Sequence, residues 1–186
     1  MKKIFAIVLT LVLLLPVLAL AETPALPYGL ALGMSTDEVE AAIAADATLS
    51  AAAFDKEDYE NGSYDYIFTE LAIPDTELVA SSADIQVDAN NSAKESKLSA
   101  ISLSLMPVEN SIATYRSLLA SMKATYGEPD SDPFADVESY VEWGTLSATW
   151  TTDALRISLS LSRMYEESIS IQYSSRINYD AADLAE

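Results

Sequence analysis

Serine occupies almost every second position in two stretches near the C-terminal end of the chain. In 155–162 it alternates with leucine and isoleucine, and in 168–174 with isoleucine and tyrosine. A period of two residues is typical of a β-strand with one buried face and one solvated face. The serine hydroxyls, which both donate and accept hydrogen bonds, would then line one side of a sheet. The chemistry that this spacing offers is binding through many short polar contacts.

An earlier stretch, 101–105, has the same alternation of aliphatic residues and serine. If these strands belong to one sheet, their outward side chains form a broad hydroxyl surface with one nearby arginine. The candidate binding residues are Ser102, Ser104, Arg156, Ser158, Ser160 and Ser170. The alternative interpretation is a solvated face of short polar residues that binds nothing.

An acidic stretch after residue 129 superficially resembles a calcium loop. Its oxygen-bearing residues are Asp130, Ser131, Asp132, Asp136 and Glu138. A calcium loop needs a glycine at its sharp turn and a bidentate glutamate at its twelfth position. Here Pro133 interrupts the loop, Ala135 stands at the glycine position and Val141 at the twelfth. The pattern favours a solvated acidic loop, and we expect no metal site.

The chain contains neither histidine nor cysteine. Ser-His-Asp and Cys-His catalysis are therefore impossible within one chain, and so are His-ligated metals and disulfides. Carboxylates are the remaining acid and base groups, and a glycoside hydrolase could use a pair of them. The candidates are Asp58, Glu60, Glu138 and Glu142. Nothing in their spacing distinguishes them from the other acidic residues, so we expect no catalytic residues and no cofactor.

Several aromatic residues lie at strand spacing and could stack on a sugar or a peptide. They are Tyr59, Tyr64, Tyr66, Tyr140, Trp143, Trp150 and Tyr165. Side chains of this kind pack more often in the core, with the hydroxyl or indole N–H reaching a polar partner. We expect packing here.

The net charge of −19 at pH 7 argues against nucleic acid and anionic lipid as partners, because both would repel the protein. Half of the residues are hydrophobic, so the acidic chain is expected to fold. Residues 1–21 have a signal-peptide pattern: Lys2 and Lys3, an apolar run, and the small-residue site Ala19-Leu20-Ala21. The alternative is an uncleaved anchor, since the apolar run approaches a membrane-spanning length.

The clearest predicted helix covers 110–129. Its apolar residues recur at spacings of three and four, and they are Ile112, Tyr115, Leu118, Leu119, Met122 and Tyr126. Asn110 or Ser111 is expected to cap its start, and Gly127 to end it. Small residues on the opposite side of this helix offer a second candidate surface for a partner. A shorter helix is predicted from Ser35, which forms a capping box with Glu38, to about Asp46.

Strands are expected at 28–32, 63–73, 77–87, around 101–105 and at 139–151, the last with a split or bulge near residue 144. Two further strands are expected in the serine-alternating stretches 155–162 and 168–174. Residues 55–61 are expected to form a charged loop. The predicted fold class is α+β, with two helices packed on one face of an antiparallel sheet. Residues 22–186 are expected to form a single domain. Residues 35–106 and 110–175 read as two helix-plus-three-strand halves, which suggests a pseudo-repeat.

Residues 32–39, LGMSTDEV, resemble the Gly-Met-Ser/Thr-x-x-x-Val signature of the SmpA/OmlA family of small outer-membrane assembly lipoproteins. The order of helix and strands is similar to the tandem repeats of beta-lactamase inhibitory proteins, and 126–129, YGEP, is similar to a helix ending that recurs in such modules. More broadly, the chain resembles small secreted bacterial proteins. The lipobox cysteine of the first family and a recognisable inhibitory loop are absent. The resemblance therefore implies an exported α+β binding module and transfers no functional residues.

These observations predict an exported, non-enzymatic binding or protein-interaction module. The expected partner is another envelope or extracellular protein, with no nucleic acid and no membrane contact after signal cleavage. The alternatives are a carboxylate-based hydrolase and a carrier of a small ligand. The hydrolase predicts two convergent carboxylates in a concavity, and the carrier predicts a sizeable apolar cavity.

Overall fold

The computed structural model describes residues 26–89, 96–132, 144–164 and 166–176. In chain order, its elements are the 3-10 helix η1 (Pro27–Gly29), α2 (Thr36–Ala45), α3 (Ala47–Ala51), β1 (Phe54–Asp58), β2 (Tyr64–Ala72), β3 (Val79–Ala89), β4 (Ser96–Leu105), α4 (Ser111–Tyr126), β5 (Thr145–Thr151), β6 (Leu155–Ser162) and β7 (Ser168–Ser175). The signal-peptide prediction for residues 1–21 falls outside these ranges.

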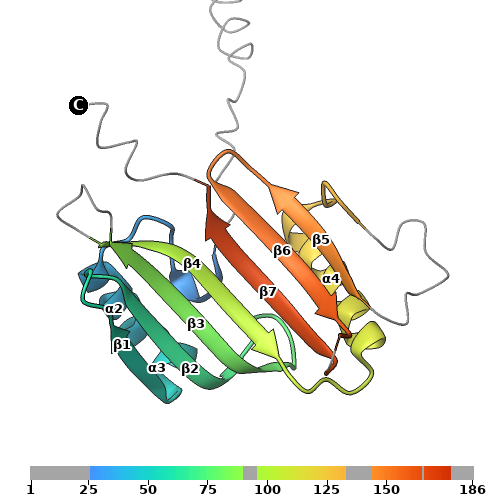
Figure 1. Ribbon diagram of the computed structural model, residues 1–186, viewed down its shortest axis with the longest axis horizontal. Helices are drawn as coiled ribbons and strands as arrows, with labels where there is room; N and C mark the ends of the chain where they lie inside the picture. Colours follow the sequence, from blue (N-terminus) through green and yellow to red (C-terminus); the bar gives the residue numbers. More distant parts are fainter. Residues whose placement is uncertain (1–25, 90–95, 133–143, 165, 177–186) are drawn as a thin grey trace, which may run out of the picture.

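One sheet carries all seven strands, in the order β1-β2-β3-β4-β7-β6-β5 (Figure 1). Every neighbouring pair is antiparallel. β4 and β7 pair at the centre, so the last strand before α4 joins the last strand after it. The predicted α+β class with an antiparallel sheet is confirmed.

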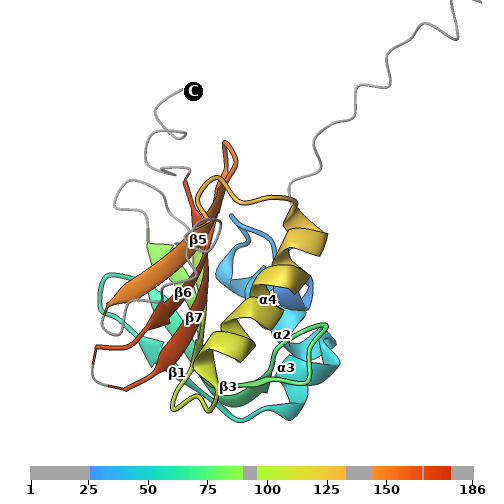
Figure 2. The same ribbon diagram turned by 90° about the vertical axis from the view of Figure 1, so that its right-hand side faces the viewer.

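The helices lie on one side of this sheet in Figure 2. α4 contacts β6 and β7, α2 contacts β4, and α3 contacts β2. The buried core lies between these helices and the sheet, and it includes Val39 of α2, Leu49 of α3 and Tyr115 of α4. The opposite side of the sheet, here called the open face, carries none of the described helices. The arrangement leaves the outward side chains of the strands accessible.

The long helix forms where its apolar spacing predicts it, and four of its apolar residues, Tyr115, Leu118, Leu119 and Met122, are buried. It ends before Gly127, whose φ of 80° suits a residue without a Cβ atom. The predicted side-chain cap at its start is wrong. Asn110 itself adopts a left-handed conformation and caps nothing, while the Ser111 hydroxyl donates to the Glu167 carboxylate.

The predicted capping box at the start of α2 is confirmed. The Glu38 N–H donates to the Ser35 hydroxyl at 3.4 Å, and the Ser35 N–H donates to the Glu38 carboxylate at 2.8 Å. The Ser35 N–H and the Ser35 hydroxyl both donate to the Glu38 carboxylate, and they hold the pKa of Glu38 below its usual value. Past α2, the Asp46 carboxylate accepts from two N–H groups and starts α3, a helix that the apolar periodicity did not indicate.

Two sequence predictions about local structure are wrong. Residues 28–32 form no strand, because Tyr28 has a φ of 61° within η1 and its hydroxyl donates to the Ala72 carbonyl at 3.0 Å. Most of the charged segment predicted as a loop is strand β1, which pairs with β2. Within the described ranges, no helix has both the length and the hydropathy needed to cross a membrane.

Candidate binding face

Five serines stand opposite one another across five neighbouring strands on the open face. The register pairs Ser82 with Ser104, Ser104 with Ser170, Ser170 with Ser160, and Ser160 with Ser147. We call this line of side chains the hydroxyl row. Its members come from β3, β4, β7, β6 and β5, so residues far apart in the sequence form one continuous polar line.

A second row runs parallel to the first, two residues further along each strand. It consists of Asp84, Ser102, Gln172, Ser158 and Thr149. Arg156 belongs to a third row, where it lies opposite Ser174 on one side and Thr151 on the other. The register thus brings the six candidate residues of the sequence analysis onto neighbouring strands of the same face.

Most hydroxyls of this face have hydrogen-bonding capacity to spare. Ser160 donates to Ser147 at 3.0 Å, which places both hydroxyls on the same side of the sheet. In the described part of the chain, no side-chain hydrogen bond of Ser102, Ser158 or Ser170 is found. These serines are half-buried, and Arg156 is exposed. The face therefore presents groups that a partner could still satisfy.

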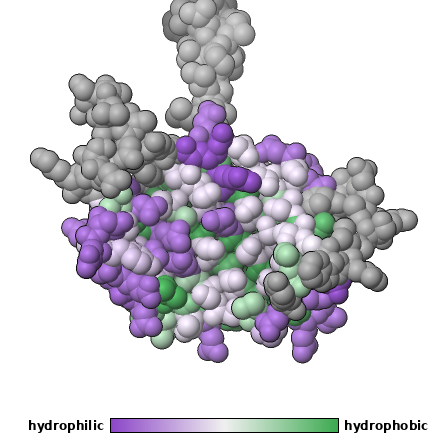
Figure 3. Space-filling model, in the orientation of Figure 1, coloured by the Kyte–Doolittle hydropathy of each residue, from purple (hydrophilic) through white to green (hydrophobic). Residues whose placement is uncertain are grey.

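The dimensions of the face follow from sheet geometry. Adjacent strands lie about 4.8 Å apart, and residues two apart along a strand lie about 6.8 Å apart. Five strands therefore extend the hydroxyl row over about 19 Å. A twist of about 20° between neighbouring strands curves the row. Figure 3 shows this side of the molecule as a pale central area with hydrophilic residues gathered toward its edges.

Carboxylates crowd the end of the open face formed by β1, β2 and β3. The Tyr59 hydroxyl donates to Glu57 at 3.1 Å and to Asp65 at 2.9 Å. On β3, the Asp84 carboxylate accepts from the Gln86 amide at 2.8 Å, while its second oxygen is buried without a partner in the described structure. Burial raises the pKa of Asp84 despite the Gln86 hydrogen bond, and nearby Asp65 and Glu57 raise it further.

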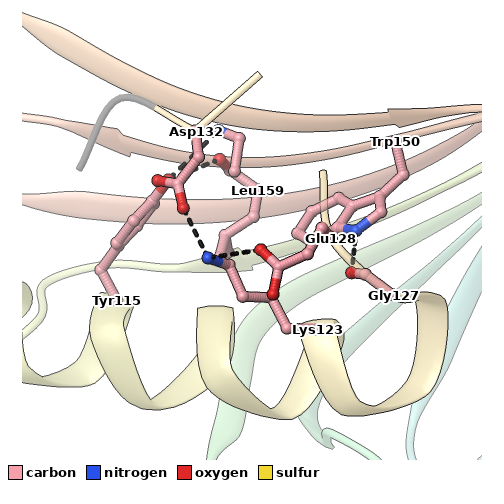
Figure 4. A network of polar contacts seen from close by, with 8 residues as sticks. Tyr115, Lys123, Gly127, Glu128, Asp132, Trp150 and Leu159 are labelled. Carbon is pink, nitrogen blue, oxygen red and sulfur yellow. Dashed lines mark hydrogen bonds and ion pairs between the residues drawn. The ribbon is translucent and has the colours of Figure 1, made fainter. Parts of the chain in front are cut away.

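The described part of the predicted acidic loop holds α4 to the sheet. Lys123 forms ion pairs with Asp132 at 2.6 Å and with Glu128 at 3.0 Å, and Figure 4 shows both carboxylates turned toward its amine. The hydrogen bond with Asp132, followed by that with Glu128, raises the pKa of Lys123. Asp136 and Glu138 lie outside the described residues. Among the described residues, no three acidic side chains are grouped so that they could hold a metal ion.

The aromatic candidates divide between the core and the surface. Tyr66 and Trp150 are buried, and the Trp150 indole N–H donates to the Gly127 carbonyl at 2.8 Å (Figure 4). Tyr64 is half-buried and Tyr59 is exposed. Tyr140, Trp143 and Tyr165 lie outside the described residues, as do the carboxylates Glu138 and Glu142. Asp58 and Glu60, the remaining carboxylate candidates, are exposed at the end of β1 and in the turn that follows.

Two concavities border α4 on the helix side of the sheet. A shallow one of about 650 Å³ separates the small residues of α4, such as Ala113 and Ser117, from the turn at 75–78. A smaller one of about 290 Å³ continues from it between α4 and η1, lined by Tyr28, Tyr126 and Tyr173 among others. Asp84 lines neither of them. Asp75 lines both concavities, and Glu77, two residues further along the same turn, lines only the larger one.

The period-two pattern of 168–174 already places Gln172 on the outward side of its strand. The face also contains Ser82, Asp84, Ser147 and Thr149, which no sequence pattern singles out as members of it. Ser82 and Asp84 follow the strand pattern of 77–87 only weakly, because β3 alternates alanine and isoleucine with polar residues of several types. Comparisons with protein-family models, with curated proteins and with solved structures found no match for this chain.

Proposed function

We propose that this protein is an exported, non-enzymatic binding module that receives another protein on its open face. In this proposal the two longer helices, packed on the other side, support the sheet and leave the hydroxyl row for the partner. The observation that carries the proposal is the register of Ser82, Ser104, Ser170, Ser160 and Ser147 across five strands.

Binding accounts for this surface better than catalysis does. No histidine can activate these hydroxyls as nucleophiles, because the chain contains none. A single hydrogen bond contributes only about 0.5–1.5 kcal/mol net. Many equivalent groups in a row are therefore useful for a broad contact and of little use for one reactive centre.

The shape of the face favours a protein as the partner. The sheet twist limits a rigid planar surface to contact with a few strands at a time. A protein surface can follow this curvature and supply the amides, hydroxyls and guanidinium groups that pair with serine. The carboxylates at the β1–β3 end of the face favour a partner whose surface is positively charged where it meets them. We infer a partner from the same exported compartment, with nucleic acid and anionic membranes disfavoured by charge.

Site-specific photo-crosslinking tests the proposal. A photoreactive residue replaces Ser104 or Ser170 on the open face and, as a control, Ala124 on the exposed side of α4. We expect both face positions to give one common protein adduct in the producing cells, and Ala124 to give none of it. Adducts that form equally at Ala124, or at no position on the face, would contradict the proposal.

A further inference from the structure

The outer edge of β1 carries no second strand in the described part of the chain. β1 stands first in the sheet order and pairs only with β2. The opposite edge of the sheet is partly covered, because the Asp130 N–H donates to the Thr149 carbonyl at 2.8 Å and the Thr149 N–H donates to Ser131 at 3.0 Å. An uncovered edge is a template on which a further strand can pair.

The hydrogen bonds between β1 and β2 determine which backbone groups face outward. The Tyr59 N–H donates to the Ser63 carbonyl at 2.9 Å, so Tyr59 points its backbone toward β2. Backbone groups of successive residues in an antiparallel strand point alternately to one side and to the other. The N–H and C=O groups of Phe54, Lys56 and Asp58 therefore point away from the sheet. They can pair with an added strand without loss of any β1–β2 hydrogen bond.

An apolar pocket of about 370 Å³ lies beside this edge, on the helix side of the sheet. It is lined by Glu40, Ile43, Ala44, Ser50, Phe54, Lys56 and Tyr66. The Phe54 side chain is 44% exposed, although its ring packs against Phe68 with centroids 4.9 Å apart. Lys56 is held at the rim by Glu40 at 2.7 Å. Side chains of an added strand that point to the helix side would meet this pocket.

Negative charge lies on the other side of the same edge. Asp55 and Glu57 alternate with the pocket-lining residues of β1, and Asp65 lies opposite Glu57. The Tyr59 hydroxyl joins the carboxylates of Glu57 and Asp65. Lys56 does not offset this charge, because its amine is already paired with Glu40. Every second side chain of an added strand would therefore meet carboxylates.

We propose that β1 receives an extended segment of a partner protein as a further strand, and that this segment alternates apolar residues with lysine or arginine. Strand addition gains affinity from backbone hydrogen bonds and specificity from pockets for alternate side chains. A second copy of this chain fits poorly at this edge, because it would bring a net charge of −19 and a second acidic β1 strand to the contact. The site is separate from the hydroxyl row, so either proposal can fail without the other.

A short synthetic peptide that alternates valine and lysine is the probe. We expect it to bind the full chain and to slow hydrogen exchange at the amides of Phe54, Lys56 and Asp58. Two further versions of the peptide carry N-methyl groups on alternate residues, so that each lacks the N–H groups of one edge. The version that retains the N–H groups facing β1 should bind at least tenfold more tightly, by Kd, than the version that lacks them. A peptide with glutamate in place of lysine should not bind.

The variant Ala44→Trp tests the pocket, and Ala45→Trp is its matched control. Both alanines are exposed on α2, but only Ala44 lines the pocket. We expect Ala44→Trp to weaken peptide binding at least tenfold and Ala45→Trp to leave it unchanged. Equal effects of the two variants, equal binding of the two N-methylated peptides, or self-association of the protein through β1 in place of peptide binding would overturn the proposal. So would the absence of exchange protection at β1.

Discussion

Tyr115 connects the long helix to the sheet through one phenol group. Its side chain is fully buried, and its hydroxyl donates to the Leu159 carbonyl at 3.3 Å and accepts from the Ala148 N–H at 3.2 Å (Figure 4). Burial raises the pKa of Tyr115 to about 12, so the phenol stays protonated at physiological pH. The phenol thereby fixes α4 against two neighbouring strands.

Replacing Tyr115 with phenylalanine removes the hydroxyl that bonds both the Ala148 N–H and the Leu159 carbonyl. We expect Tyr115→Phe to lower the free energy of unfolding by about 1–3 kcal/mol, measured by urea denaturation. Tyr64→Phe is the control, because the Tyr64 ring is half-buried and no hydrogen bond of its hydroxyl is found among the described residues. Equal free energies of unfolding for the two variants would contradict a stabilising role of the Tyr115 hydrogen bonds.

Asp84 carries a carboxylate whose second oxygen is buried without a partner in the described structure. Its folded-state pKa is raised, so the folded protein binds this proton more tightly than the unfolded chain does. The free energy of unfolding therefore falls as the pH rises from the unfolded-state pKa of Asp84, about 3.9, through its raised folded-state pKa.

The variant Asp84→Asn removes this titration while keeping an oxygen for the Gln86 amide. We expect it to be more stable than the original protein at pH 7 and to lose this advantage as the pH falls below about 4. Asp88→Asn, an exposed position on the same strand, should have little effect at either pH. An advantage that stays constant with pH would show that ionisation of Asp84 is not its cause.

At the scale of elements, α4 is the part of the fold that the sequence predicts best. Its apolar residues follow the helical period, and the contacts with β6 and β7 use that side of the helix. β1 is the part that the sequence predicts worst. Its residues Phe54–Asp58 are mostly charged, and their extended conformation depends on pairing with β2, which no local pattern reveals.

A charge placed on the buried side of α4 tests its role in the core. We expect Leu119→Asp to cost at least about 3 kcal/mol, because it removes a buried apolar side chain and desolvates a carboxylate. In a protein of this size that corresponds to a fall in Tm of about 6–12 °C. Ala120→Asp, at the next and exposed position, is the matched control. An unchanged Tm for Leu119→Asp would contradict the packing of α4.

For the candidate face, the sequence predicts which side of a strand a residue occupies but not which residues lie opposite it on neighbouring strands. Alternation predicts that Ser158 and Ser160 share one side of their strand, because the period of a strand is local. The alignment of Ser160 with Ser170 and Ser104 depends on strand order and register, which are fixed by contacts between distant segments. The central pairing of β4 with β7 is one such contact, and nothing in either stretch indicates it.

At the scale of the whole molecule, the strand order has a symmetry that bears on the predicted pseudo-repeat. From one side toward the centre of the sheet the order is β2, β3, β4, and from the other side it is β5, β6, β7. A duplicated helix-plus-three-strand unit would produce this order, with β1 and α3 as additions to the first half. The internal repeat stays a prediction, since the two halves share little sequence.

The central claim is that the hydroxyl row binds a protein partner. Its most direct test is to measure the Kd with which the partner identified by crosslinking binds two matched variants of this protein. One carries glutamate at Ser158, Ser160 and Ser170; the other carries glutamate at three exposed alanines of α4, namely Ala113, Ala120 and Ala124. Both add the same charge. We predict that the first weakens binding at least a hundredfold, about 2.7 kcal/mol, while the second changes it little. Unchanged binding by the first variant, or equal loss in both, would contradict the account.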